Sequence, residues 1–149
     1  MSSHPWDAQY SSDFEKGLAF QDFVLQRCGM QGFLFYPYSS TKAQGLSCES
    51  PCGFEIKLDD RLKDTGNLYI ETQSRRTPER EWSWSGIYAH RDDRLLFIGN
   101  YLEVYVFTMK WLRRVHRDGE YRVVEIPTSR GFLVSREEAE KCLACWRLL

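Results

Sequence analysis

Hydrophobic and polar residues alternate along two neighbouring segments in the middle of the chain, residues 54–59 (FEIKLD) and 68–73 (LYIETQ). Successive side chains of a β-strand point to opposite faces, so each segment is expected to form a strand with one apolar and one polar face. A turn-like segment at 64–67 separates the two. The polar faces carry Glu55, Lys57 and Asp59 on the first strand, and Tyr69, Glu71 and Gln73 on the second.

The other segments predict further helices and strands. Apolar residues at near-helical spacing predict a helix over 13–28, after a loose tail at 1–12. Strands are expected at 33–36, 95–98, 101–107 and 121–126, with helices over 109–117 and from 135 to about 147. Segments 95–98 and 101–107 either meet at a two-residue turn, Gly99-Asn100, or form one long bent strand. This order predicts an α/β or α+β fold in which helices flank a sheet.

Length and composition narrow the class of protein. The chain has 149 residues, of which 42% are hydrophobic and 28% charged. These values predict one globular domain over 13–149. No apolar run approaches the ~18 residues of a membrane span, and the polar N-terminus lacks the apolar segment of a secretion signal. We therefore expect a cytoplasmic protein without a membrane partner.

The five cysteines have two interpretations. Their odd number, in a chain without a signal, favours free thiols over disulfides. Four of them could instead form a zinc site: Cys48, Cys52, Cys142 and Cys145. Against zinc, Cys142 and Cys145 fall on the predicted last helix, where cysteines three residues apart are often core residues.

Charge is unevenly distributed along the chain. The formal net charge of −1 argues against a protein that coats nucleic acid through bulk electrostatics. Segments 74–80 and 110–117 are nonetheless basic, whereas acidic residues gather at 55–71 and 137–140. This division suits a metal-dependent enzyme that acts on a phosphodiester, with carboxylates for the metal and arginines for the phosphates.

The polar faces of the two central strands predict chemistry. Carboxylate oxygens are ligands for Mg²⁺, and a neighbouring lysine can position or deprotonate a water molecule. The alternative is that alternating Glu and Lys form the solvent face of a half-buried sheet. Segment 82–88, with two tryptophans and Ser85-Gly86, is either a hydrophobic plug under a loop or a wall beside the substrate.

Three parts of the chain resemble a known family. Segment 54–59 follows the pattern E-[IV]-K-x-D, and segment 65–71 holds a TGN turn and a strand ending in Glu. Ser85-Gly86-Ile87 follows in the same order. Together they resemble small phage-type proteins of the PD-(D/E)XK nuclease superfamily. The resemblance implies a restriction-endonuclease-like core, with a central mixed β-sheet flanked by helices, and metal-dependent cleavage of phosphodiester bonds. If the protein is phage-encoded, the expected location is the host cytoplasm.

The resemblance also implies site residues. Glu55 and Lys57 match the Glu-x-Lys of the family, but its upstream Asp is absent from the 20 residues before Glu55, where Glu49 is the nearest acidic residue. In a second register Asp59 is the upstream acid, and Glu71-Thr72-Gln73 is a Glu-x-Gln variant. The expected catalytic residues are Glu55, Lys57, Glu71 and Gln73. The expected ligands of Mg²⁺ or Mn²⁺ are Glu49, Glu55, Asp59 and Glu71.

Several basic residues are candidate contacts to nucleic acid, with DNA as the expected substrate. They are Arg75, Arg76 and Arg80, together with Ser85 of the Ser-Gly-Ile segment, and Arg113 and Arg114 of the predicted short helix. A solvated helix face is the alternative for the last two. RNA as substrate and a homodimer both stay open. Two other classes also stay open: a nuclease-like binding module that has lost cleavage, and a zinc-stabilised interaction domain.

Overall fold

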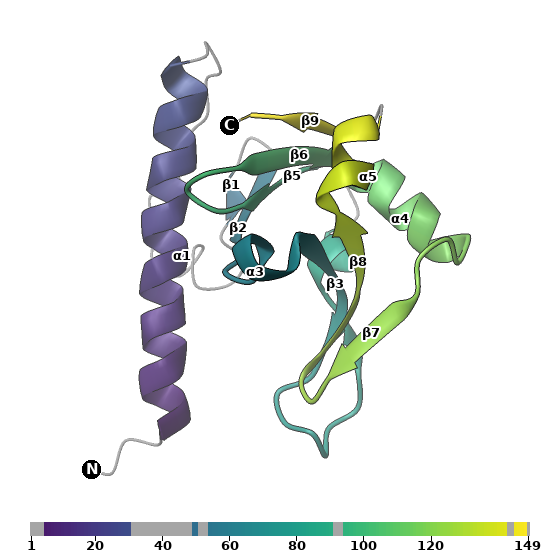
Figure 1. The fold of residues 1–149 in the computed structure, drawn as a ribbon. Helices are drawn as coiled ribbons and strands as arrows, with labels where there is room; N and C mark the ends of the chain where they lie inside the picture. The colour runs from purple at the N-terminus through teal and green to yellow at the C-terminus, as the bar shows by residue number, and fades with distance from the viewer. Residues whose placement is uncertain (1–4, 31–48, 51–53, 91–93, 143–144, 149) are drawn as a thin grey trace.

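The computed structural model describes residues 5–30, 49–50, 54–90, 94–142 and 145–148. The chain forms an α+β fold (Figure 1). Its helical elements are α1 (Pro5–Met30), α3 (Leu62–Thr65), η1 (Gly86–Tyr88), α4 (Met109–Arg117) and α5 (Arg136–Lys141). Its strands are β1 (Glu49–Ser50), β2 (Phe54–Leu58), β3 (Asn67–Ser74), β4 (Ser83–Trp84), β5 (Leu95–Gly99), β6 (Val104–Thr108), β7 (Val123–Ile126), β8 (Ser129–Ser135) and β9 (Cys145–Arg147).

The strands form two sheets. The mixed sheet has the order β1-β2-β5-β6-β9, in which β2 and β5 are parallel and the other pairs antiparallel. The antiparallel sheet has the order β4-β3-β8-β7. The sequence predicted that segments 54–59 and 68–73 are neighbouring strands of one central sheet. This prediction is wrong, because β2 and β3 belong to different sheets. Parallel strands need a long crossover, and here β3, β4 and η1 lie within the crossover from β2 to β5.

The mixed sheet is covered on both faces by different elements. Alternate residues of β2, β5 and β6 form one apolar cluster with α1, including Phe20, Phe54, Phe97 and Val106. The intervening residues of β5 and β6 form a second cluster with the antiparallel sheet and α4, including Leu96, Phe107, Ile70, Leu112 and Phe132. Figure 1 shows α1 along one side of the mixed sheet and β3, β8 and α4 on the other side.

Two helices differ in length from the predictions. α1 begins at Pro5 rather than residue 13, so residues 5–12 are helical and not a loose tail. Proline suits the first helical turn because the amide hydrogen that it lacks has no partner there. The last helix begins as predicted, with a capping box between Ser135 and Glu138, but ends at Lys141. Residues 145–147 instead form β9 and pair with β6. Helix 109–117 is confirmed.

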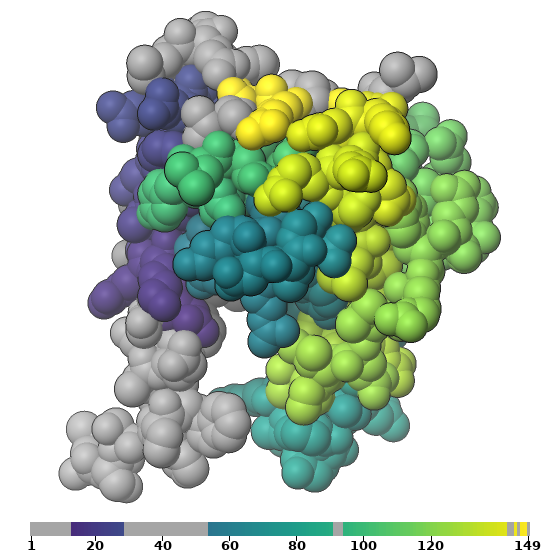
Figure 2. Space-filling view, viewed as in Figure 1, coloured from purple at the N-terminus to yellow at the C-terminus, as the bar shows by residue number. Residues whose placement is uncertain are grey.

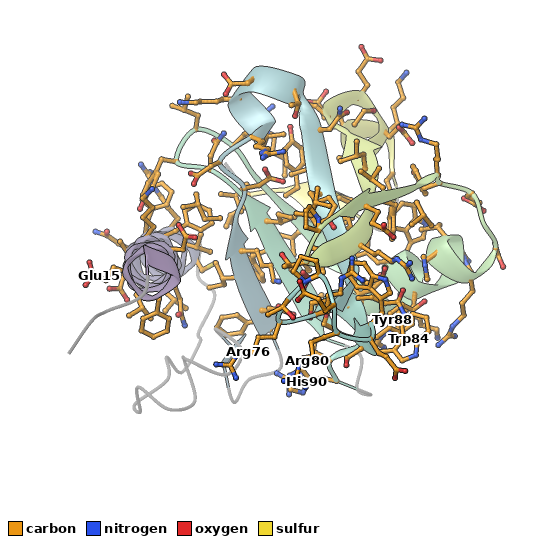
Figure 3. The ribbon with its side chains drawn as sticks, turned by 90° about the horizontal axis from the view of Figure 1, so that it is seen from below. Glu15, Arg76, Arg80, Trp84, Tyr88 and His90 are labelled. Carbon is orange, nitrogen blue, oxygen red and sulfur yellow. The ribbon has the colours of Figure 1, made fainter. Side chains whose placement is uncertain are left out.

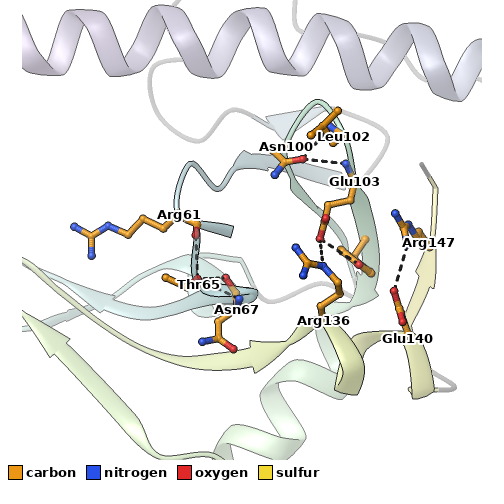
Figure 4. A network of polar contacts seen from close by, with 10 residues as sticks. Arg61, Thr65, Asn67, Asn100, Leu102, Glu103, Arg136, Glu140 and Arg147 are labelled. Carbon is orange, nitrogen blue, oxygen red and sulfur yellow. Dashed lines mark hydrogen bonds and ion pairs between the residues drawn. The ribbon is translucent and has the colours of Figure 1, made fainter. Parts of the chain in front are cut away.

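The connection from β5 to β6 also differs from both predictions. It spans residues 100–103 and is neither a two-residue turn nor a continuous strand. Asn100 Oδ1 accepts hydrogen bonds from the amides of Leu102 and Glu103, at 2.8 and 2.9 Å. The Glu103 side chain then accepts from Arg136 Nε at 2.8 Å, which joins this turn to α5 (Figure 4). The predicted strand 33–36 lies outside the described residues.

Among the described residues, no helix is both long and apolar enough to cross a membrane.

Candidate functional site

The site begins with the alternation of β2. Phe54 and Ile56 pack in the cluster with α1, so Glu55 and Lys57 lie on the opposite face. That face is turned toward the antiparallel sheet, because Leu96 and Ile98 of the neighbouring β5 belong to the cluster on that side. Glu55 is 4% exposed, which is unusual for a carboxylate. The predicted strand and its two faces are confirmed, and on the polar face Glu55 is buried whereas the Lys57 side chain is 38% exposed.

Glu55, Lys57 and Glu71 come together although they belong to different sheets. Lys57 Nζ lies 3.6 Å from Glu55 Oε1 and 3.9 Å from Glu71 Oε2. One ammonium therefore contacts a carboxylate from each sheet. Burying a charge costs several kcal/mol unless it is paired, so the lysine offsets the cost of placing two carboxylates here.

Hydroxyl groups hold the Glu71 carboxylate on both sides. Ser129 Oγ donates to Glu71 Oε1 at 2.8 Å, and Ser85 Oγ donates to Oε2 at 3.2 Å. The Tyr69 hydroxyl lies 2.6 Å from Ser129 Oγ. Because a serine has one proton and Ser129 gives it to Glu71, Tyr69 donates to Ser129. Burial, with the nearby Glu71 charge, raises the pKa of Tyr69, which keeps its proton in place at neutral pH.

Glycines allow the backbone to approach this cluster closely. Gly86 has φ +56°, and a Cβ added there would lie 2.0 Å from the carbonyl oxygen of Glu71. At Gly131, which pairs with Glu71 across the β3–β8 ladder, an added Cβ would lie 2.2 Å from the Ile70 carbonyl oxygen and 2.9 Å from the Tyr69 ring. The contacts of η1 and Tyr69 around Glu71 therefore depend on both glycines.

A small pocket opens at this point. The three charged residues line it together with Tyr69, Ile70, Gly86, Ile87, Leu96 and Ile98. Its walls are largely apolar, and its two carboxylates face one ammonium group, that of Lys57. A site of this kind can hold a cation, or can use the lysine to attract an anion.

Asp59 and Gln73, two other predicted site residues, do not line the pocket. Asp59 Oδ2 accepts from the Tyr69 amide at 2.8 Å and Oδ1 from the Arg61 amide at 3.1 Å. Burial raises the pKa of Asp59, and these backbone hydrogen bonds partly oppose the increase. The carboxylate of Asp59 thus ties the end of β2 to β3, and does so outside the cluster.

Gln73 is turned away by a bulge in β3. The register against β8 shifts between Glu71 and Gln73, and Gln73 accepts a long hydrogen bond, 3.5 Å, from Arg130. A bulge of this kind breaks the two-residue period, so the predicted Glu-x-Gln register does not bring both side chains to the pocket. Glu49 of β1 is the residue opposite Glu55 in the mixed sheet.

The predicted basic residues have different surroundings. Arg75 Nε donates to the Pro127 carbonyl oxygen at 2.7 Å, and its guanidinium lies 4.0 Å from the centre of the Trp82 ring. Arg76, Arg80 and Arg114 are exposed. Segment 75–82 and the β7–β8 turn form a tip that projects from the body of the molecule (Figure 2). Figure 3 labels Arg76 and Arg80 in a view of the molecule from below.

Arg113 corrects the prediction of an outward-facing residue. It is buried, and it donates to the Ile87 carbonyl oxygen at 2.7 Å and to that of His90 at 2.8 Å. Because Arg113 belongs to α4 and its two acceptors lie in η1 and just after it, these hydrogen bonds hold η1 against α4. Its role is to position the pocket wall, and its guanidinium is not presented to a phosphate. Similarly, Ser85 points to Glu71 rather than outward.

The cysteines that the structure describes lie in or beside the core. Cys28 and Cys145 are buried, and burial raises their pKa to about 11 and about 12. Cys145 lies on β9 and not on a helix with Cys142, which corrects the predicted placement. The other two residues of the predicted zinc site, 48 and 52, lie outside the described residues. Within the described residues, no group of three or more His, Cys, Asp or Glu side chains could hold a metal.

Sequence reasoning missed Ser129 and gave Tyr69 no role. Tyr69 shares the polar face of β3 with Glu71, so the alternation could have indicated it. Ser129 follows the Pro127 turn, far from Glu71 in sequence, and reaches it only through the pairing of β3 with β8. No local pattern signals such a contact.

Comparison with protein-family models, with curated proteins and with solved structures gives no match for this chain.

Proposed function

We propose that this protein is a Mg²⁺- or Mn²⁺-dependent nuclease that cleaves DNA. The observation that carries the proposal is the convergence of Glu55 and Glu71 on the Lys57 ammonium in one pocket. Both carboxylates line one pocket and offer the oxygen ligands that Mg²⁺ and Mn²⁺ prefer, and the ion would bind beside the Lys57 ammonium rather than in its place. Glu55 and Glu71 would hold the ion.

Each residue of the cluster has a role in this proposal. A bound ion supplies a Lewis acid that polarises the phosphate and lowers the pKa of water. Lys57 orients the attacking water or stabilises charge that develops on the phosphate oxygens. Ser85 and Ser129 fix the rotamer of Glu71, and Tyr69 fixes Ser129. These are positioning residues, and the resemblance to PD-(D/E)XK nucleases agrees with the roles of Glu55 and Lys57.

We also propose that the mixed sheet and α1 form a restriction-endonuclease-like core. A helix packed on a mixed sheet supports it. The site departs from the expected arrangement because Glu71 comes from a strand of the second sheet and because Asp59 and Gln73 do not line the pocket.

A second candidate is a nuclease-like binding module without activity. The observation that favours it is the number of carboxylates: two line the pocket, and Asp59, the predicted third, is hydrogen-bonded elsewhere. A smaller ligand set lowers affinity for the ion.

Cleavage assays separate the two candidates. Linear, circular and branched DNA would be incubated with Mg²⁺, Mn²⁺ or EDTA. We expect cleavage that requires metal and falls at least about 100-fold in Lys57→Ala, since removing a group that stabilises transition-state charge has costs of this order. Lys63→Ala removes an exposed lysine from α3 and should retain the wild-type rate.

Folded wild-type protein that cleaves none of these substrates with either metal would contradict the nuclease proposal and favour the binding module. Equal activity of Lys57→Ala and wild type would contradict the assignment of the site.

A further inference from the structure

Three aromatic side chains form a surface cluster beside the pocket, which we name the aromatic patch: Trp84, Tyr88 and His116. The centroid of the Trp84 ring lies 5.0 Å from that of Tyr88 and 6.4 Å from that of His116. The Tyr88 hydroxyl and His116 Nδ1 share a hydrogen bond of 2.6 Å. Trp84 remains 61% exposed, so much of its indole surface is open to a ligand.

The aromatic patch is held rigidly. The His116 ring stacks on the buried Phe132, with centroids 5.9 Å apart and ring planes 12° from parallel. Arg113 fixes η1, and with it Tyr88, to α4 through the carbonyl oxygens of Ile87 and His90. A preorganised aromatic surface loses little conformational entropy when a flat group stacks on it.

The aromatic patch adjoins the proposed catalytic cluster. Trp84 is followed directly by Ser85, whose hydroxyl donates to Glu71 Oε2. Gly86 and Ile87, the next two residues, line the pocket. Tyr88 completes η1. One short segment of backbone therefore joins Trp84 to residues that line the pocket.

The charge around the aromatic patch favours a polyanion. Apart from the buried Arg113, segments 75–90 and 109–117 contain six Lys and Arg residues and two Glu, although the whole chain has a net charge of −1. The Arg117 guanidinium lies 5.9 Å from the centre of the Tyr88 ring, and Arg114 is exposed on the same helix. Figure 3 shows Trp84 and Tyr88 next to each other.

We infer that Trp84 stacks on an unpaired base, so that the substrate of this site is nucleic acid that is single-stranded or has unpaired nucleotides beside the scissile bond. The inference rests on the proposed nuclease function and names its substrate class. Bases inside a duplex cover each other's faces and cannot stack on a protein side chain, whereas every unpaired base offers a face to an aromatic ring. The flanking arginines would contact the phosphates.

Binding measured without metal tests this inference apart from cleavage. Fluorescence anisotropy would follow a labelled single strand and a matched blunt duplex in EDTA. We expect Trp84→Ala to weaken binding of the single strand by about 5- to 150-fold, the range for loss of one stacked base, and to change duplex binding little. Trp84→Tyr should restore most of the affinity. Leu102→Ala removes an exposed apolar side chain, 78% exposed, from the turn between β5 and β6, and should bind like wild type.

Several outcomes would overturn the inference. One is that Trp84→Ala binds the single strand with wild-type affinity, and another is that it loses equal affinity for single strand and duplex. A third is that the wild-type protein binds neither nucleic acid, which would favour a protein partner for the aromatic patch. Failure of the nuclease proposal would look different: single strands would bind in a Trp84-dependent way, but no metal would produce cleavage. Circular dichroism of both Trp84 variants shows whether they are folded.

Discussion

The carboxylate of Glu71 is fixed by neutral groups, which leaves its charge intact. Hydrogen bonds to a charged acceptor contribute about 1.5–3 kcal/mol each, so Ser85 and Ser129 hold one rotamer strongly. A carboxylate has about four acceptor sites, of which these hydroxyls take two. The Lys57 ammonium lies on the side of Oε2, at 3.9 Å, so this carboxylate already faces a cation. Glu71 is thus arranged to bind a cation without having to move.

His116 gives the molecule a pH dependence that follows from its surroundings. Burial, and then the neighbouring Arg117, lowers the pKa of His116 in the folded state. Between this value and the ordinary value of 6.5, the unfolded chain binds more protons than the folded one. The free energy of unfolding should therefore fall as the pH drops below 6.5, by less than about 1 kcal/mol because the ring is partly exposed.

Urea unfolding at pH 7.5 and pH 5.5 measures this effect. His116→Gln should show a smaller loss between the two pH values than wild type, since Gln does not titrate. The groups that face the ring, Tyr88, Arg117 and Trp84, stay the same in both proteins. Equal losses in the two proteins would show that His116 does not cause the pH dependence.

At the residue scale, the sequence predicted the three charged residues that meet but not the groups that hold them. Alternation placed Glu55 and Lys57 on one face, and the order of the strands suggested Glu71. Arg113 was predicted to face solvent because charged residues on a helix usually do. Its burial follows from two backbone acceptors in η1 and the segment after it, which no helical pattern reveals.

At the scale of elements, the site depends on how closely η1 approaches β3. Gly86 has a left-handed backbone, and a side chain there would overlap the backbone of Glu71. Gly119 provides a matched comparison, because it has a similar φ of +68° but nothing within 4 Å of an added Cβ. Comparing substitutions at the two glycines therefore distinguishes the effect of backbone strain from the effect of close contact.

We predict that Gly86→Ala destabilises the protein by more than about 2 kcal/mol, and Gly119→Ala by about 1 kcal/mol. Urea unfolding of both variants measures the difference. Gly86→Ala should also lose cleavage at temperatures where it is still folded, because displacing η1 moves Ser85 away from Glu71. Equal destabilisation by the two substitutions would contradict the close packing of η1 on β3.

The faces of β2 and β3 could be predicted from the sequence, whereas their partners could not. A two-residue period states which side chains share a face, but it does not say which strand lies alongside. The pairing of β2 with β5 and of β3 with β8 is set by contacts distant in sequence. The early end of α5 has the same origin, since residues after Lys141 gain hydrogen bonds by joining β6.

At the scale of the molecule, the candidate site lies where two sheets face each other. Glu55 and Lys57 come from the mixed sheet and Glu71 from the antiparallel sheet, with the apolar cluster of Leu96, Ile98 and Ile70 beside them. The packing of the two sheets therefore sets the separation of the carboxylates. The sequence predicted the α+β class, but the second sheet requires knowledge of tertiary pairing that local patterns do not contain.

Binding of Mn²⁺ tests most directly whether the two sheets build a metal site. Electron paramagnetic resonance of free Mn²⁺ would give the affinity of wild type, Glu55→Gln, Glu71→Gln and the control Glu125→Gln. The control removes an exposed carboxylate of β7 that pairs with Arg130. We predict one site, weakened at least about tenfold in each of the first two variants and unchanged in the control. Mn²⁺ affinity that is the same in all four proteins would contradict the assignment of Glu55 and Glu71 as metal ligands.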